Sequence, residues 1–264
     1  QLAEEAPDRL KGIVSVHAEA IKAMAVWDDE LFRLFIDYLS FETSEGIMTG
    51  AALKRAGEAT WVHSVPKFKQ LRPIFMAQGR LLICTGYTSD QELIQAMAER
   101  FDLPFQPLHE DDMFDTLEEV SAAERQRGEL LLRAADEALL PFECQAKLRR
   151  FLPANLPVLY AMSDEVQFLR QLQTAQENSS GIFSGALASM LSGVEERPLA
   201  TLYLNLNSPI VRRLVTTADP ELLASMVRVL YVQALLAGGH PLRGGELKTM
   251  NQALLDLLEH TAGI

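Results

Sequence analysis

The sequence predicts a mixed α/β (α+β) protein in which a small three-layer α/β/α subdomain is joined by a long helix to a C-terminal α+β domain. Short runs of β-forming residues alternate with helical patterns between residues 60 and 109. A charged helical pattern follows, and two strongly apolar helical patterns occupy residues 219–260. These observations divide the chain into three expected parts: residues 1–115, a connector helix over 116–141, and residues 142–264.

The N-terminal part is expected to begin with helices. Apolar residues recur at helical spacing over residues 8–38, and Asp28 is placed to cap a restart after Trp27. Residues 40–57 are small and polar, so we expect mainly a connection there, with one short helix at 48–53.

A small parallel sheet is expected next. Residues 60–65, 81–86 and 105–109 read as strands, and helices opened by Pro66 and by Ser89–Asp90 separate them. The order strand–helix–strand–helix–strand favours parallel strands with helices on both faces of the sheet.

The C-terminal part contains two expected strands, at 157–162 and 200–206, and a helix that begins at Ser208–Pro209. Leucines alternate with Tyr203 and Asn205 in the second strand, which predicts that one of its faces is exposed.

The two terminal helices are the main candidates for an interaction site. The first is apolar on almost every face, and the second has the three-and-four spacing of a helix–helix seam. We expect the pair to dimerise the protein, although packing of the pair inside its own domain would give the same pattern. The candidate interface residues are Leu223, Met226, Leu230, Leu247, Met250, Leu254 and Leu258.

Composition and charge exclude several classes of protein. Hydrophobic residues make up 48% of the chain and charged residues 23%, as in ordinary globular proteins. The net charge of −12 argues against a nucleic-acid partner. We expect no membrane partner, because no apolar run reaches the roughly 18 residues of a membrane span. The acidic start does not resemble a signal peptide, so a cytoplasmic location is expected.

Motifs for catalysis or metal binding are weak. The sequence GYTSD at 86–90 follows an expected strand but has neither GxGxxG nor GKS/T, so a plain helix cap is favoured over a phosphate site. The five histidines and two cysteines show no metal-ligand spacing. An interaction protein without catalytic residues is therefore expected. The alternative is a small α/β enzyme or sensor that binds a nucleotide or metabolite near residues 86–90.

Three segments carry a family resemblance. The sequences LNLNSPIV at 204–211, LYVQALLAGG at 230–239 and MNQALL at 250–255 resemble, in this order, the C-terminal region of the bacterial-type heat shock protein 90 chaperones. With less detail, LFIDYLSF at 34–41 is similar to the start of the small middle subdomain of that family. The segment ATWVHSV at 59–65 departs from the family pattern, which indicates a divergent member.

The resemblance implies a middle-to-C-terminal fragment, beginning within a helix near Asp8, of an ATP-driven chaperone. It implies that the parent binds ATP and magnesium in an upstream N-terminal domain, and no residue of this chain corresponds to that site. It also implies homodimerisation through the terminal helices and binding of unfolded client proteins. A stretch rich in glycine and serine contains the client-binding candidates, although packing on the domain's own sheet is the other interpretation; these residues are Ile182, Phe183, Leu187, Met190 and Leu191.

Overall fold

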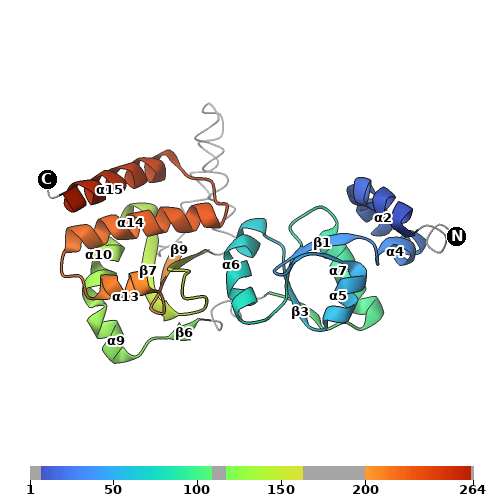
Figure 1. Ribbon diagram of the computed structural model, residues 1–264, viewed down its shortest axis with the longest axis horizontal. Coiled ribbons are helices and arrows are strands. Elements are labelled where there is room, and N and C mark those ends of the chain that lie inside the picture. The colour runs from blue at the N-terminus through green and yellow to red at the C-terminus, as the bar shows by residue number, and fades with distance from the viewer. Residues whose placement is uncertain (1–6, 109–116, 163–199, 263–264) are drawn as a thin grey trace, which may run out of the picture. The chain divides into compact units, whose positions relative to one another are not determined.

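The computed structural model describes residues 7–108, 117–162 and 200–262, and the contacts divide the chain into two compact units, residues 1–112 and 113–264 (Figure 1). Both units combine helices with a mixed sheet, so the α+β class predicted from the sequence is confirmed. Each unit is described by itself.

The first unit begins with α2 (Pro7–Val16), α3 (Ala18–Ala25) and α4 (Asp29–Phe35). The expected restart at Asp28 is present: its Oδ1 accepts hydrogen bonds from the backbone N–H groups of Glu30 (2.8 Å) and Leu31 (3.0 Å). The side chain therefore satisfies two of the amide groups that the first turn of α4 leaves unpaired.

A hairpin occupies the segment that was expected to be a connection. It consists of β1 (Ser40–Thr43) and β2 (Gly46–Thr49), and α5 (Gly50–Ala56) follows. Gly46 has a φ of 112°, a conformation that favours glycine and so allows the two-residue turn. Each strand has only four residues, and β2 alternates between half-buried and exposed residues without a fully buried face. The apolar alternation that would predict a strand is therefore weak.

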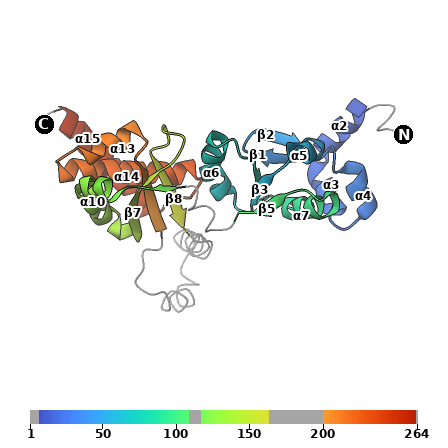
Figure 2. The same ribbon diagram turned by 90° about the horizontal axis from the view of Figure 1, so that it is seen from below.

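The expected parallel sheet is present within a five-stranded mixed sheet of order β2-β1-β4-β3-β5. The strand β3 (Ala59–Val62) pairs in parallel with both β4 (Leu82–Cys84) and β5 (Phe105–Pro107), and β1 adds to β4 in antiparallel fashion. The helix α6 (Val65–Ala77) packs on β3 and β4, and α7 (Asp90–Phe101) lies on the other side of β3 (Figure 2). These elements form three layers, α/β/α.

The predicted connector helix over 116–141 is not continuous. It is replaced by β6 (Glu118–Glu119), α9 (Ala122–Arg127), α10 (Glu129–Leu139) and a short 3₁₀ turn, η1 (Leu140–Phe142). Ser121 and Glu124 form a capping box that begins α9, which ends at Gly128. The helix α10 buries an apolar face against β7 and α14, so this stretch belongs to the core of the second unit.

The second unit contains a four-stranded sheet of order β6-β7-β9-β8. The strand β9 (Ala200–Asn205) lies between β7 (Cys144–Arg150), to which it is parallel, and β8 (Val158–Met162), to which it is antiparallel.

The expectation that β9 has an exposed face is wrong: Tyr203 is 4% and Asn205 0% exposed. The Asn205 side chain can be buried because its polar atoms have partners. It accepts a hydrogen bond from the backbone N–H of Phe151 (3.1 Å) and donates to the carbonyls of Phe151 and Leu156 (2.9 Å each). A buried amide with these partners loses little on leaving water.

Three helices complete the second unit where the sequence places them: α13 (Pro209–Val215), α14 (Pro220–Ala237) and α15 (Gly244–Ala262). Asp219 caps α14 by accepting hydrogen bonds from the backbone N–H groups of Glu221 (3.0 Å) and Leu222 (3.1 Å). The helix α14 packs on α10 and β8, and α15 lies along its outer side (Figure 1).

By length and composition alone, α14 would be able to cross a membrane, with 18 residues and a mean hydropathy of 1.3. The expectation that no segment reaches this length therefore holds only for uninterrupted apolar runs, since α14 includes Glu221 and Arg228. Eight of its residues are buried in the second unit, which is how the core helix of a soluble protein behaves.

Candidate interaction site on the terminal helix

The terminal helices form an antiparallel pair. Tyr231 Oη lies 2.8 Å from Glu246 near the connecting turn, and farther along Ser225 Oγ lies 3.3 Å from Asp256. Near the far end the two helices border a groove of about 500 Å³ that is lined by charged residues of both helices, including Asp219, Glu259 and His260.

Glu246 anchors the start of α15 to the core. Its side chain is fully buried and accepts hydrogen bonds from the Tyr231 hydroxyl (2.8 Å) and the backbone N–H of Arg243 (2.8 Å). Tyr231 is itself fully buried and stacks on Phe142, with ring centroids 5.1 Å apart. Because a buried carboxylate requires such partners, this contact fixes where α15 begins.

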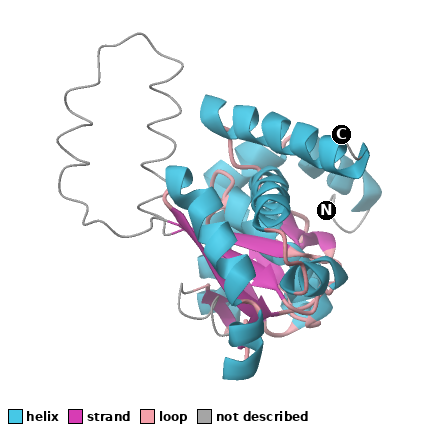
Figure 3. Ribbon diagram, turned by 90° about the vertical axis from the view of Figure 1, so that its left-hand side faces the viewer, coloured by secondary structure: helices cyan, strands magenta, loops and turns pink. Residues whose placement is uncertain are grey.

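Beyond this anchor, α15 buries little apolar surface. Ala253 is its other buried residue. The helical repeat of 3.6 residues places Glu246 and Ala253 on one face and Leu247, Leu254 and Leu258 on another. These leucines are 47%, 42% and 64% exposed, and the adjacent Leu255 is 53% exposed. We call these four leucines the α15 stripe. In Figure 3, α15 is the helix that ends near the C label, at the outer edge of its unit.

The seven predicted interface residues separate into three groups. Leu223 (0% exposed) and Leu230 (5%) belong to the hydrophobic core, so the prediction that they form an interface is wrong. Met226 and Met250 are half-buried against that core. Leu247, Leu254 and Leu258 remain exposed.

The sequence reasoning failed at Leu223 and Leu230 because periodicity does not show that α10 and the sheet cover α14. It missed Leu255, although Leu255 lies three residues before Leu258 and so fits the same spacing. The adjacent pair Leu254–Leu255 was the available signal.

The client-binding candidates lie outside the described residues. Ile182, Phe183, Leu187, Met190 and Leu191 all fall within the segment 163–199. Their role stays a prediction.

The loop at 86–90 is tied to its own unit. Asp90, the only carboxylate in this stretch, is 1% exposed, and its Oδ1 lies 2.7 Å from Nζ of Lys22 on α3. At this distance the ammonium of Lys22 is a charge-assisted partner of the buried carboxylate. Burial raises the pKa of Asp90, and the ammonium of Lys22 opposes this rise.

Gly86 is equally confined. A Cβ atom there would lie 2.8 Å from a side-chain carbon of Val65 and 3.0 Å from the carbonyl of His63. Tyr87 donates a hydrogen bond to Glu42 (2.6 Å), which raises the pKa of Tyr87 to about 12.

Ser89, which was expected with Asp90 to cap the following helix, precedes α7 with a φ of 67° and forms no side-chain capping hydrogen bond, so that expectation is wrong. Tyr87 and Asp90 are engaged within the first unit by Glu42 and Lys22.

Within residues 7–108, 117–162 and 200–262, no three His, Cys, Asp or Glu side chains come together as a metal site would require. Cys84 and Cys144 are buried free thiols, and burial raises the pKa of Cys84.

No protein-family model matches this chain, and neither does any curated protein.

Proposed function

We propose that this chain is the middle-to-C-terminal part of a heat shock protein 90-type chaperone and that the α15 stripe joins two copies of it. The observation that carries the proposal is the α15 stripe itself: four leucines exposed on one terminal helix. The sequence resemblance at 204–255 supplies the family. Its three segments fall on β9 and the start of α13, on α14, and on α15.

A symmetric dimer suits such a surface. In a two-fold interface each residue appears twice, so four leucines per chain become eight. Burying an aliphatic side chain completely stabilises by about 1.5–3 kcal/mol. Contiguous exposed apolar residues of this kind usually mark an interaction surface.

The role of such a dimer in an ATP-driven chaperone would be a tether. A permanent contact at one end makes any second contact between the two copies intramolecular, which raises its effective concentration. The chemistry of ATP would then belong to the upstream domain of the parent. Titration calorimetry with ATP and magnesium tests this division, and binding at 86–90 would instead favour the enzyme or sensor alternative.

Sedimentation equilibrium tests the dimer. We expect the wild-type chain to sediment above its monomer mass of 29.4 kDa, and Leu254→Asp with Leu258→Asp to sediment as a monomer. Each introduced aspartate would be buried without a partner in the dimer interface, and this cost should prevent association.

Gly245→Asp is the matched control, because it adds a negative charge to α15 at an exposed residue outside the stripe, where an added side chain meets no other atom. Circular dichroism should show that all variants remain folded. A monomeric wild-type chain at high concentration, or a dimeric double variant, would contradict the proposal.

Client binding is the second part of the proposed function and rests on the sequence alone. Phe183→Ser combined with Met190→Ser should weaken suppression of aggregation of a denatured test protein, because two large apolar side chains are lost. Unchanged suppression by the double variant would remove this part of the proposal and leave dimerisation standing.

A further inference from the structure

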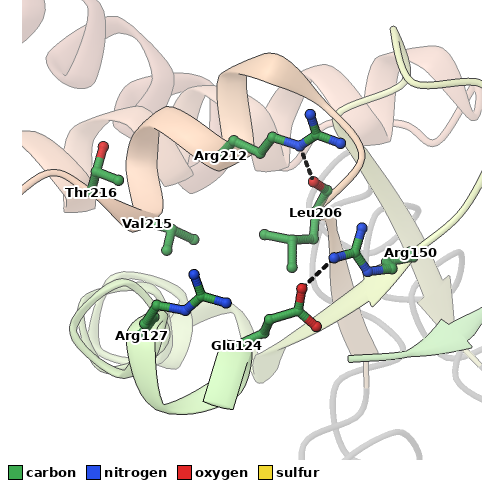
Figure 4. Close-up of a pocket in the computed structure, with 7 residues that line it drawn as sticks. All are labelled: Glu124, Arg127, Arg150, Leu206, Arg212, Val215 and Thr216. Atoms are coloured by element: carbon green, nitrogen blue, oxygen red, sulfur yellow. Dashed lines mark hydrogen bonds and ion pairs between the residues drawn. The ribbon is translucent and has the colours of Figure 1, made fainter. Parts of the chain in front are cut away.

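A pocket of about 430 Å³ opens in the second unit at the carboxyl ends of its two parallel strands. Arg150 is the last residue of β7, and Leu206 directly follows β9. The helices α9 and α13 supply the other lining residues (Figure 4). Open α/β sheets bind ligands outside the carboxyl ends of their strands, and this volume lies in the range of small-molecule sites.

One charge pair in the pocket is already complete. Arg150 Nη2 pairs with Glu124 Oε1, and Arg150 Nη1 donates to Asn207 Oδ1 at 2.9 Å. Glu124 Oε2 accepts from the backbone N–H (3.0 Å) and the hydroxyl (2.9 Å) of Ser121. Together with Arg150, these bonds lower the pKa of Glu124 to about 2, so the carboxylate stays ionised at neutral pH. The pair contributes no net charge.

Two further arginines are not neutralised. Among the residues that the structure describes, neither Arg127 nor Arg212 forms an ion pair with a carboxylate. Arg212 Nε donates to the carbonyl of Leu206 at 2.9 Å, which holds the guanidinium at the pocket and leaves both terminal nitrogens available. Arg127 approaches from α9 on the other side, as Figure 4 shows. The pocket therefore offers two positive charges in a chain whose net charge is −12.

Part of the pocket lining is apolar. Figure 4 shows the side chains of Leu206 and Val215 pointing into the pocket. Thr216 lies at the edge, and its hydroxyl already donates to the carbonyl of Arg213 (2.8 Å). Direct donors to an anion are therefore the arginines, and the apolar side chains would contact an uncharged part of the same ligand.

We infer that this pocket binds a small organic anion, with a phosphate or carboxylate group between Arg127 and Arg212 and a short apolar group over Leu206 and Val215. Guanidinium groups suit both kinds of oxyanion because they donate parallel hydrogen bonds. The inference does not depend on dimerisation, since no residue of the α15 stripe lines the pocket.

Isothermal titration of the whole chain with phenyl phosphate tests the inference, with benzoate, inorganic phosphate and phenol as comparison probes. Phenyl phosphate should bind more tightly than inorganic phosphate or phenol, and benzoate shows whether a carboxylate is accepted equally. Arg127→Gln and Arg212→Gln should each weaken binding about tenfold, since a hydrogen bond to a charged group contributes about that factor.

Arg125→Gln and Arg213→Gln are the matched controls, because each removes the same charge from α9 or α13 at a residue that does not line the pocket. Both should keep the affinity within about twofold, as expected for a screened surface charge. Equal losses in controls and pocket variants would reduce the effect to general charge attraction and overturn the site. So would the absence of phenyl phosphate binding to the folded wild-type chain.

Discussion

The helices α14 and α15 have nearly the same length, 18 and 19 residues, yet they use their apolar residues in opposite ways. Eight residues of α14 are buried, whereas α15 buries only Glu246 and Ala253. The apolar residues of α14 complete the core of their own chain, and four leucines of α15 remain exposed. Apolar content alone therefore does not distinguish a core helix from an interaction helix.

The difference follows from position in the fold. The helix α14 lies between α10, β8 and α15, and so meets neighbours on several sides, whereas α15 contacts mainly α14. A helix with a neighbour on one side can bury only one stripe in its own chain. Any apolar residue outside that stripe is left for water or for a partner.

The largest effect on stability should come from a charge placed on the buried face of α14. Leu230→Asp places a charge in the core, and we expect it to lower the free energy of unfolding of the second unit by more than about 3 kcal/mol. Urea unfolding followed by circular dichroism measures this change.

The exposed Leu254 provides the contrast. Leu254→Asp should change the unfolding free energy of the monomer by no more than about 0.5 kcal/mol, the usual range for surface substitutions. Both stabilities are to be compared at concentrations where the chain is monomeric, because association would add its own stabilisation. Equal losses from the two variants would show that α15 is as deeply packed as α14.

A smaller effect is expected at the contact that joins the two helices. Tyr231→Phe removes the hydroxyl that donates to the buried Glu246, and should cost about 1–3 kcal/mol because that carboxylate loses a partner. Hydrogen exchange should show faster opening of the first turns of α15.

Protection of β9 should remain high in the same experiment, since no contact of that strand is removed. A uniform loss of protection over the second unit would mean that α15 does not open separately from the core. If the α15 stripe forms the dimer, Tyr231→Phe should also weaken association.

Local signals in the sequence predicted much of the fold. Asp28 caps a helix where expected, and Pro209 opens α13. The strands β8 and β9 agree with the β-forming runs at 157–162 and 200–206. These features depend on residues close together in the chain.

The errors arose where distant residues decide. The hairpin β1–β2 is held in the sheet because β1 pairs with β4, which lies about 40 residues away. The sequence at 116–141 is rich in charged residues, and its pattern did not predict that α10 buries one face in the core. In the first unit, Asp90 is paired with Lys22 on α3, which is 68 residues earlier in the chain. No spacing rule connects such positions.

For the candidate sites the same limit applies. The sequence by itself determined that the last two helices are strongly apolar. Only the tertiary structure decided that Leu223 and Leu230 are core residues, that the α15 stripe is exposed, and that Arg127 and Arg212 line one pocket. The physical reason is that periodicity fixes which face of a helix a residue occupies, whereas burial and charge neutralisation depend on which other elements cover that face.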